Sequence, residues 1–172
     1  AYEIGVRLVG SEMCIRDRVP MHQDAHYWPI QPMSTCSVWI AADRATKHNG
    51  CLTVIAGSHK KETLKHIVNN NKTALDSGIE DRYLKNKIKD YITLEPGQIS
   101  LHHANLIHGS YQNDSPYRRA GIVYRYMSSH SNFNRKVKNH DQKDGHSVNY
   151  SKRPIWLING SKKNNTLVKI HY

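Results

Sequence analysis

The chain has 172 residues, which suits one folded domain and leaves little room for two. Hydrophobic residues make up 38% of it, enough to form a buried core, which argues against wholesale disorder. No apolar run approaches the ~20 residues of a membrane-spanning helix, so we expect no membrane association. The cysteines are sparse and odd in number, which argues against a disulfide framework and favours a reducing, cytoplasmic location: Cys14, Cys36 and Cys51.

The formal net charge of +11 is concentrated near the C-terminus. Residues 129–172 hold nine basic side chains against two acidic ones. Such a segment can form a patch for nucleic acid or another polyanion. It lacks the regular aromatic interleaving of a base-stacking surface, so we favour a solvated surface rich in Lys and Asn and expect no nucleic-acid partner.

Residues 1–18 differ in character from the rest of the chain. They lack a starting Met and the apolar segment and cleavage site of a signal peptide. The string Val-Arg-Leu-Val-Gly-Ser-Glu-Met-Cys-Ile-Arg-Asp-Arg resembles a translated sequencing-adapter read-through, as found at the ends of environmental gene fragments. We therefore interpret residues 1–18 as a non-native leader, with an ordinary amphipathic leader as the alternative, and place the domain at residues 19–172.

Short β-branched and aromatic runs between turn signals predict a chain made mostly of strands. Apolar residues at near-helical spacing predict one inserted helix over residues 79–91, capped by Asp76 or Ser77. The pattern is typical of an all-β sandwich or barrel with one inserted helix. In chain order, we expect strands at residues 37–42, 51–56, 99–103, 106–111 and 120–127, and a late strand or anchor at 154–158, with turns at 49–50, 95–98 and 113–116.

His22-Gln23-Asp24 is the first candidate for chemistry. On a strand, residues i and i+2 project from the same face, so an imidazole nitrogen and a carboxylate oxygen can reach one metal ion. In a chain with twelve His and fourteen acidic residues, about one such pattern is expected by chance. The motif alone therefore leaves open a His and a solvated Asp that bind no metal.

His108 is the candidate for a second imidazole, brought in from a distant strand. Two His and one carboxylate on one side of an octahedral ion leave three positions open, which is the arrangement of non-haem Fe(II) oxygenases. His102 and His103 compete for this role, although His103 cannot share a strand face with His108 unless a bulge intervenes. A histidine that only supports the ligands is the alternative reading of each.

Arg119 is the candidate for binding an anion near this metal. A hairpin centred on residues 114–115 would pair His108 with Gly121 and point His108 and Arg119 to the same side. A buried Arg offers a two-pronged contact to a carboxylate. It could take the C5 carboxylate of 2-oxoglutarate while the C1 carboxylate and C2 ketone bind iron. An exposed hairpin charge is the alternative.

Five motifs occur in the following order: His22-Gln23-Asp24-Ala25-His26-Tyr27-Trp28, Trp39-Ile40-Ala41-Ala42-Asp43, Asn49-Gly50-Cys51-Leu52-Thr53-Val54-Ile55-Ala56-Gly57-Ser58-His59, Leu94-Glu95-Pro96-Gly97-Gln98, and His108-Gly109-Ser110 with Arg119. Together they resemble the phytanoyl-CoA dioxygenase family of Fe(II)/2-oxoglutarate oxygenases. The resemblance covers about residues 20–126 and returns at residues 153–156.

This resemblance implies a double-stranded β-helix core (jelly roll, cupin-like), here partial. It implies that His22, Asp24 and His108 bind Fe(II) and form the catalytic centre, and that Arg119 holds the C5 carboxylate of 2-oxoglutarate. Further contacts to 2-oxoglutarate fall on Trp39, Ser110 and Gln23. Family members usually carry about a hundred more residues before the His-x-Asp motif, so we expect this chain to be a fragment of a longer protein.

The implied reaction is hydroxylation of an unactivated C–H of a small organic substrate, with O₂ as cosubstrate and succinate and CO₂ as coproducts. Related halogenases carry a small residue in place of Asp24, so its carboxylate favours hydroxylation. We expect substrate contacts at His26, Tyr27 and Trp28, with structural packing as the alternative. Rival hypotheses are a cupin-like protein that uses another metal, a basic nucleic-acid-binding β module and a non-catalytic homologue; substrate and oligomeric state stay open.

Overall fold

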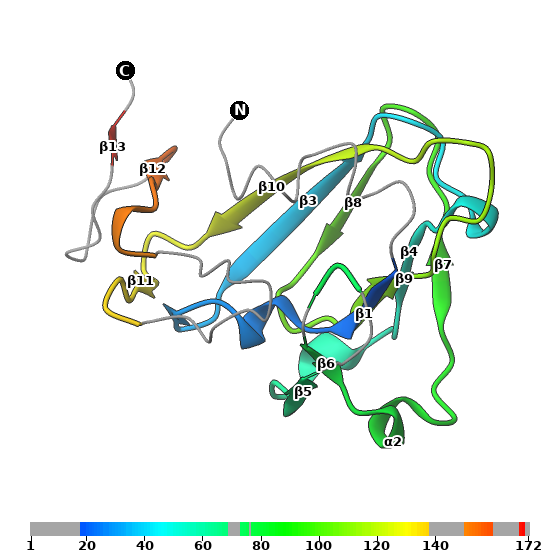
Figure 1. Ribbon diagram of the computed structural model, residues 1–172. Helices are drawn as coiled ribbons and strands as arrows, with labels where there is room; N and C mark the ends of the chain where they lie inside the picture. Colours follow the sequence, from blue (N-terminus) through cyan, green and yellow to red (C-terminus); the bar gives the residue numbers. More distant parts are fainter. Residues whose placement is uncertain (1–17, 69–72, 76, 138–149, 160–168, 171–172) are drawn as a thin grey trace.

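The computed structural model describes residues 18–68, 73–75, 77–137, 150–159 and 169–170, which form two main antiparallel sheets (Figure 1). The first sheet has the strand order β1-β9-β4-β7, with bounds Val19–His22, His108–Ser110, Leu52–Val54 and Asp90–Ile92. The second has the order β10-β3-β8, with bounds Gly121–Met127, Thr35–Ala41 and Ile99–His102. Successive strands repeatedly cross between the two sheets, as in a double-stranded β-helix, which confirms the predicted all-β jelly roll.

The remaining elements are short. Three two-stranded ribbons join β11 (Asn132–Phe133) to β2 (Ile30–Gln31), β5 (His66–Val68) to β6 (Ser77–Ile79), and β12 (Trp156–Leu157) to β13 (Lys169–Ile170). Single turns of helix occur at η1 (Asp24–His26), η2 (Lys47–Asn49), η3 (Ser58–Lys60), α2 (Asp81–Leu84) and η4 (Tyr150–Lys152). Within the described ranges, no helix is long and apolar enough to cross a membrane.

Strand β3 shows how the sequence creates an inner face. Its residues alternate strictly between buried and partly exposed, as expected for a strand with one face on the core. Trp39 and Ala41 lie on the buried face and pack with Ala45 and Cys51. On the opposite face of the same sheet, apolar side chains stay exposed: Ile99, Leu101, Ile122, Tyr124 and Tyr126.

Two further apolar clusters support the segments that carry the site. Met21 of β1 packs with Ile55, Ile79 and Ile107, and so joins the first sheet to the β5-β6 ribbon. Ile30, Phe133 and Tyr150 form the other cluster, against which Trp28 is partly buried. The segment that follows β1 is therefore held by apolar contacts on both sides.

The predicted inserted helix is present, but it is much shorter than residues 79–91. Only α2 (Asp81–Leu84) is helical, between β6 and β7. Ile79 is paired with His66 in the β5-β6 ribbon, and Ile88 is 82% exposed. Asn86, with a φ of 62° in the left-handed region, lies in the turn that follows α2, where the helix has ended. The apolar residues do not form one helical face, because Ile79 and Leu84 pack in one cluster, Tyr91 packs in another, and Ile88 is exposed.

The predicted hairpin between residues 106–111 and 120–127 is wrong. His108 of β9 pairs with His22 of β1 and Val54 of β4, whereas Gly121 of β10 pairs with Ala41 of β3. The connection crosses between the two sheets instead of folding back on itself. Tertiary pairing overrode the local turn signal, as is usual in jelly rolls.

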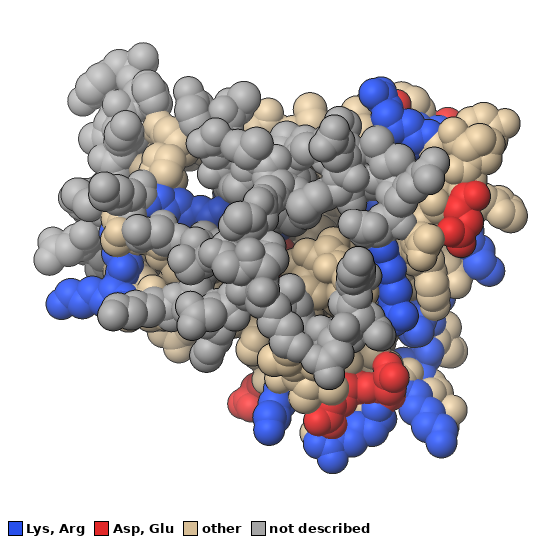
Figure 2. All heavy atoms as spheres, viewed as in Figure 1, with Lys and Arg blue, Asp and Glu red and all other residues tan. Residues whose placement is uncertain are grey.

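The charge pattern is only partly visible. Most of residues 1–18 and several basic residues of the C-terminal segment lie outside the described residues. On the face seen in Figure 2, the Lys and Arg side chains of the described residues lie scattered, with acidic side chains among them at several points.

Candidate metal centre

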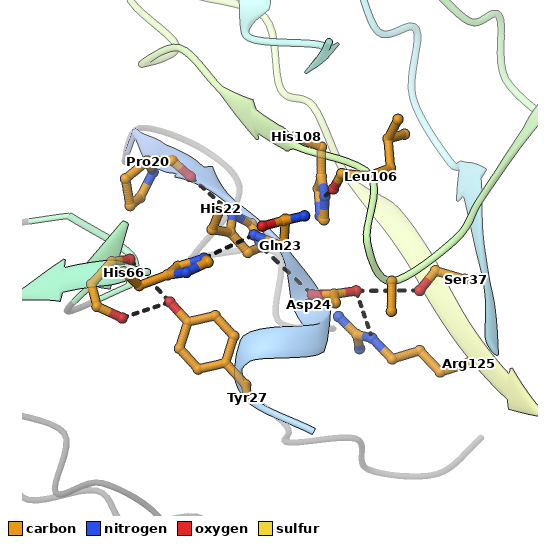
Figure 3. A network of polar contacts seen from close by, with 12 residues as sticks. Pro20, His22, Gln23, Asp24, Tyr27, Ser37, His66, Leu106, His108 and Arg125 are labelled. Carbon is orange, nitrogen blue, oxygen red and sulfur yellow. Dashed lines mark hydrogen bonds and ion pairs between the residues drawn. The ribbon is translucent and has the colours of Figure 1, made fainter. Parts of the chain in front are cut away.

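Three side chains converge on one point at the inner end of β1 and β9 (Figure 3). The nitrogen and oxygen atoms that His22, Asp24 and His108 offer to a metal lie within 4.8 Å of one another. The Nε2 atom of His22 is 3.5 Å from Oδ1 of Asp24, and the two imidazole rings are 4.2 Å apart between centroids. All three residues are buried. The structure therefore brings together the three predicted metal ligands.

The His-x-Asp motif is split between two elements. His22 ends β1 and Asp24 begins η1, so the two do not share a strand as the simple pattern assumes. Gln23 between them keeps extended backbone angles, φ −122° and ψ 125°, which preserves the alternation of an extended chain. Both side chains consequently point to the same side.

Both ligand histidines are oriented by backbone carbonyls. The Nδ1 atom of His22 lies 2.9 Å from the carbonyl oxygen of Pro20, and Nδ1 of His108 lies 2.9 Å from that of Leu106. Because a carbonyl only accepts, each Nδ1 carries the ring proton and each Nε2 keeps its lone pair. Burial, followed by the neighbouring His22, lowers the pKa of His108 to about 3, so this ring is neutral and able to bind a metal.

Asp24 directs one oxygen to the ligand cluster and is held by the other. Ser37 Oγ donates to Oδ2 at 3.3 Å, and the Nε atom of Arg125 lies 3.6 Å from the same oxygen. Burial works to raise the pKa of Asp24, but the Arg125 guanidinium holds that pKa well below its usual range. Asp24 is therefore a carboxylate with Oδ1 available to a cation.

Gln23 anchors the backbone between the two ligands. Its side chain donates to the carbonyl oxygen of Asn105 at 2.7 Å and accepts from the backbone N–H of Leu64 at 2.8 Å. Its backbone N–H donates to Nε2 of His66 at 3.0 Å. The completely buried side chain thus has a structural task, and its predicted contact to 2-oxoglutarate stays a prediction.

A second group of predicted residues lies on the inner faces of the sheets. Ser110 follows His108 by two residues on β9 and faces the same side. Its hydroxyl oxygen is buried and has no hydrogen-bond partner within the described part of the chain. Arg119 is 6% exposed, so it is not the exposed surface charge of the alternative interpretation. It is buried even though the predicted hairpin is absent. It lies near Cys51. Burial raises the pKa of the Cys51 thiol, and the Arg119 guanidinium partly offsets this rise.

Trp39 belongs to the same region. A Cβ atom added to Gly121 would lie 2.3 Å from two ring carbons of the Trp39 indole, so the ring lies directly over the glycine. Gly121 is two residues from Arg119 at the start of β10. Trp39 and Arg119 therefore lie near the same end of the inner face.

The two competing histidines have different roles. Nε2 of His103 lies 2.9 Å from the carbonyl oxygen of Met33, and its Nδ1 accepts from the backbone N–H of Asn105. This ring is fully used in holding the chain. His102 is closer to the site, with its ring 4.7 Å from that of His108 between centroids.

The three predicted substrate-contact residues surround the site in different ways. The ring of His26 stacks on that of His66 at 4.0 Å and 6°. Tyr27 approaches His22 edge-on at 6.0 Å, and its hydroxyl group lies 2.8 Å from Oγ of Ser77. Trp28 lies beneath the Arg125 guanidinium, 5.2 Å from the ring centre. Their contacts to a substrate stay predictions.

Sequence reasoning missed Ser37, His66 and Arg125. The alternation along β3 could have placed Ser37 on the same face as Trp39, and Arg125 has the same parity along β10 as Gly121. His66 had no comparable signal, because it comes from a two-stranded ribbon in a segment for which the sequence analysis predicted no strand.

The donor set fits Fe(II). Two imidazoles and one carboxylate suit a borderline divalent metal and leave octahedral positions open. The buried hydroxyl of Ser110, which lacks a partner among the described residues, and the buried Arg119 suit the carboxylate of a bound ligand.

A double-stranded β-helix with two histidines and one aspartate at its inner face defines the class of non-haem Fe(II)/2-oxoglutarate oxygenases. The family model described as phytanoyl-CoA dioxygenase (PhyH) matches residues 12–121. The chain belongs to the phytanoyl-CoA dioxygenase family.

The curated relatives agree with this assignment. The chain is 34% identical over 117 residues to peroxisomal phytanoyl-CoA dioxygenase of Homo sapiens, covering 65% of this chain and 34% of the relative. It is 34% identical over 118 residues to a probable phytanoyl-CoA dioxygenase of Caenorhabditis elegans, covering 66% and 38%. The chain thus spans little more than a third of the length of these relatives.

Solved structures share the fold. The non-heme monooxygenase ThoJ superposes with a TM-score of 0.63 at 19% identity, covering 91% of this chain and 52% of that one. EvdO2 from Micromonospora carbonacea var. aurantiaca gives a TM-score of 0.57 at 25% identity, covering 67% and 47%.

Proposed function

We propose that this chain forms the catalytic core of an Fe(II)- and 2-oxoglutarate-dependent dioxygenase that hydroxylates a small organic substrate and releases succinate and CO₂. The observation that carries the proposal is the convergence of His22, Asp24 and His108 within 4.8 Å. Bound iron would supply the activation of O₂ and the oxidation of an unactivated C–H. The names of the curated relatives support the same reaction class.

The chain's own residues would bind and orient. His22 and His108 offer Nε2 because their Nδ1 atoms are held by carbonyl groups, and Asp24 offers Oδ1 because its other oxygen is held by Ser37 and Arg125. This arrangement fixes the ligands before the metal arrives, which reduces the conformational cost of binding. A carboxylate at Asp24 fills a coordination position, which favours hydroxylation over chemistry that needs a bound halide.

Arg119, Ser110 and Trp39 would hold 2-oxoglutarate. Arg119 supplies a buried positive charge and Ser110 an available hydroxyl group, which match the far carboxylate of a keto-diacid. Trp39 would close the same end with an apolar wall. Because His22, Asp24 and His108 are buried, water would be excluded from the reacting centre.

The location in the cell stays a prediction. The sparse cysteines favour a reducing compartment, from which we expect the cytoplasm. The human relative carries the word peroxisomal in its name.

An anaerobic titration with Fe(II) and then 2-oxoglutarate tests the proposal. We expect a weak visible metal-to-ligand charge-transfer band when both are bound. Arg119→Ala should weaken 2-oxoglutarate binding by about tenfold or more and leave Fe(II) affinity unchanged, because a charge-assisted contact is lost away from the metal. Arg44→Ala is the matched control, since Arg44 is exposed and paired with Glu95.

Two results would contradict the proposal. If wild-type protein binds Fe(II) without gaining the band on addition of 2-oxoglutarate, a cupin-like protein of another metal chemistry is the better description. If Arg119→Ala and Arg44→Ala bind 2-oxoglutarate equally well, Arg119 does not hold this cosubstrate.

A further inference from the structure

One rung of the second sheet faces the metal centre. Ser37 of β3 is directly opposite Arg125 of β10 on one side and His102 of β8 on the other. Residues directly opposite in adjacent strands point to the same face of a sheet. Since the Ser37 hydroxyl donates to Asp24, all three side chains of this Ser37 rung point toward the metal ligands. Figure 3 shows Ser37 and Arg125 beside Asp24.

The two outer members of the rung touch the ligands themselves. The Nε atom of Arg125 is 3.6 Å from Oδ2 of Asp24, and its guanidinium lies over the Trp28 ring at 5.2 Å. The ring of His102 is 4.7 Å from that of His108 between centroids. A molecule bound beside the metal on this side would meet both groups.

Arg125 and His102 each have a polar atom that is available to a bound molecule. Nη1 of Arg125 and Nδ1 of His102 are buried and have no hydrogen-bond partner in the parts of the chain that the structure describes. The whole Arg125 side chain is 14% exposed. A buried charged donor without a partner is costly, so such a group in a native protein calls for a bound ligand or water.

The charges indicate what that ligand is. Asp24 is the buried carboxylate at the site, whereas Arg119 and Arg125 both bring positive charge. Fe(II) adds two positive charges and 2-oxoglutarate adds two negative ones. One positive charge is left over, next to Arg125, because Arg119 would take the far carboxylate of 2-oxoglutarate. A single carboxylate balances it, whereas a phosphate monoester would overcompensate.

From this geometry we infer that the organic substrate carries a carboxylate, which Arg125 binds through Nη1 with His102 beside it, next to the iron. The inference rests on the proposed function and adds the substrate class. The Arg125 guanidinium lies over the Trp28 ring, which restrains its position beside the metal ligands. The same Arg125 keeps Asp24 in place through Nε.

The test uses the full chain under anaerobic conditions. Fe(II) and 2-oxoglutarate are added first, and the charge-transfer band is recorded. 4-Fluorobenzoate and its neutral analogue 4-fluorobenzamide are then titrated separately, and ¹⁹F line broadening by the paramagnetic iron reports binding near the metal. We expect the acid to bind about tenfold or more tightly than the amide.

Variants assign this preference to a residue. Arg125→Met should abolish the preference for the acid, Arg125→Lys should retain part of it, and His102→Gln should reduce it. Arg44→Met, which changes an exposed arginine paired with Glu95, should leave it unchanged. Circular dichroism and the Fe(II) dissociation constant of each variant separate loss of fold or of the metal from loss of the carboxylate contact.

Each other outcome has one meaning. If the acid and the amide bind wild-type protein equally well, or if neither binds, the inference is overturned. The proposed function still stands in that case, provided that the charge-transfer band of bound Fe(II) and 2-oxoglutarate is present. The inference is also overturned if Arg125→Met loses affinity for Fe(II) or 2-oxoglutarate but still binds the acid more tightly than the amide. Arg125 would then act only through Asp24 or the cosubstrate. Absence of the band in wild-type protein refutes the proposed function first and the inference with it.

Discussion

Adding one methyl group at Gly121 should damage both the core and the cosubstrate site. The Cβ of an alanine there would lie 2.3 Å from Cε2 and Cζ2 of Trp39 and 2.8 Å from Nε1, whereas ordinary contact begins at 3.4 Å. The indole would have to move by about an ångström. It has little room, because it packs with Ala41, Ala45 and Cys51.

We expect Gly121→Ala to lower the free energy of unfolding by about 1–3 kcal/mol, the usual cost of overpacking a core. For a chain of this length that corresponds to a loss of roughly 2–12 °C in Tm. Urea unfolding followed by tryptophan fluorescence measures the free energy, and the anaerobic titration measures 2-oxoglutarate binding, which should weaken as Trp39 moves.

A double-mutant cycle with Trp39→Leu identifies the cause. Trp39→Leu is destabilising by itself, but in that background Gly121→Ala should cost less than about 0.5 kcal/mol, because the clashing ring is gone. If Gly121→Ala is equally costly with Trp or Leu at position 39, or costs nothing in the wild-type background, the packing argument is refuted.

Two further predictions concern His66 and the metal. Burial lowers the pKa of His66 to about 4, whereas an unfolded histidine titrates near 6.5. The unfolded chain therefore binds the extra proton first, so the free energy of unfolding should fall by about 2–3 kcal/mol as the pH drops from 6.5 to 4 and be unaffected by this group above 6.5. Urea unfolding at several pH values in this range measures the dependence of the free energy of unfolding on pH. This dependence should be weaker for His66→Gln than for wild-type protein and unchanged for the exposed His59→Gln. An equal dependence in all three proteins would contradict the role of His66. Separately, Co(II) at about a hundred times its dissociation constant should raise this free energy by about 2.7 kcal/mol. Calorimetry should show that gain lost in Asp24→Ala and kept in the exposed His48→Ala, and a gain that survives Asp24→Ala would place the metal elsewhere.

The predicted extent of the helix and the predicted hairpin failed for a common reason. Residues 79–91 have helical apolar spacing, and residues 113–116 have a strong turn signal, but both are local patterns. In the structure, Ile79 is used in a ribbon with β5, and the segment after β9 crosses to the other sheet. A short-range signal cannot decide which distant strand offers the better partner.

The amino-acid sequence by itself indicated the mostly-β character of the chain and a strand at residues 37–42, which depend on residue type and act within a few residues. It indicated His22, Asp24 and His108 as metal ligands through the order of motifs that resemble a family, and not through a local period. Tertiary structure alone decided that His108 lies opposite His22, that Arg119 is buried without a hairpin, and that Ser37, His102 and Arg125 form one rung beside Asp24. Such contacts join segments far apart along the chain, so they follow from the pairing of whole strands and from burial, which no local pattern encodes.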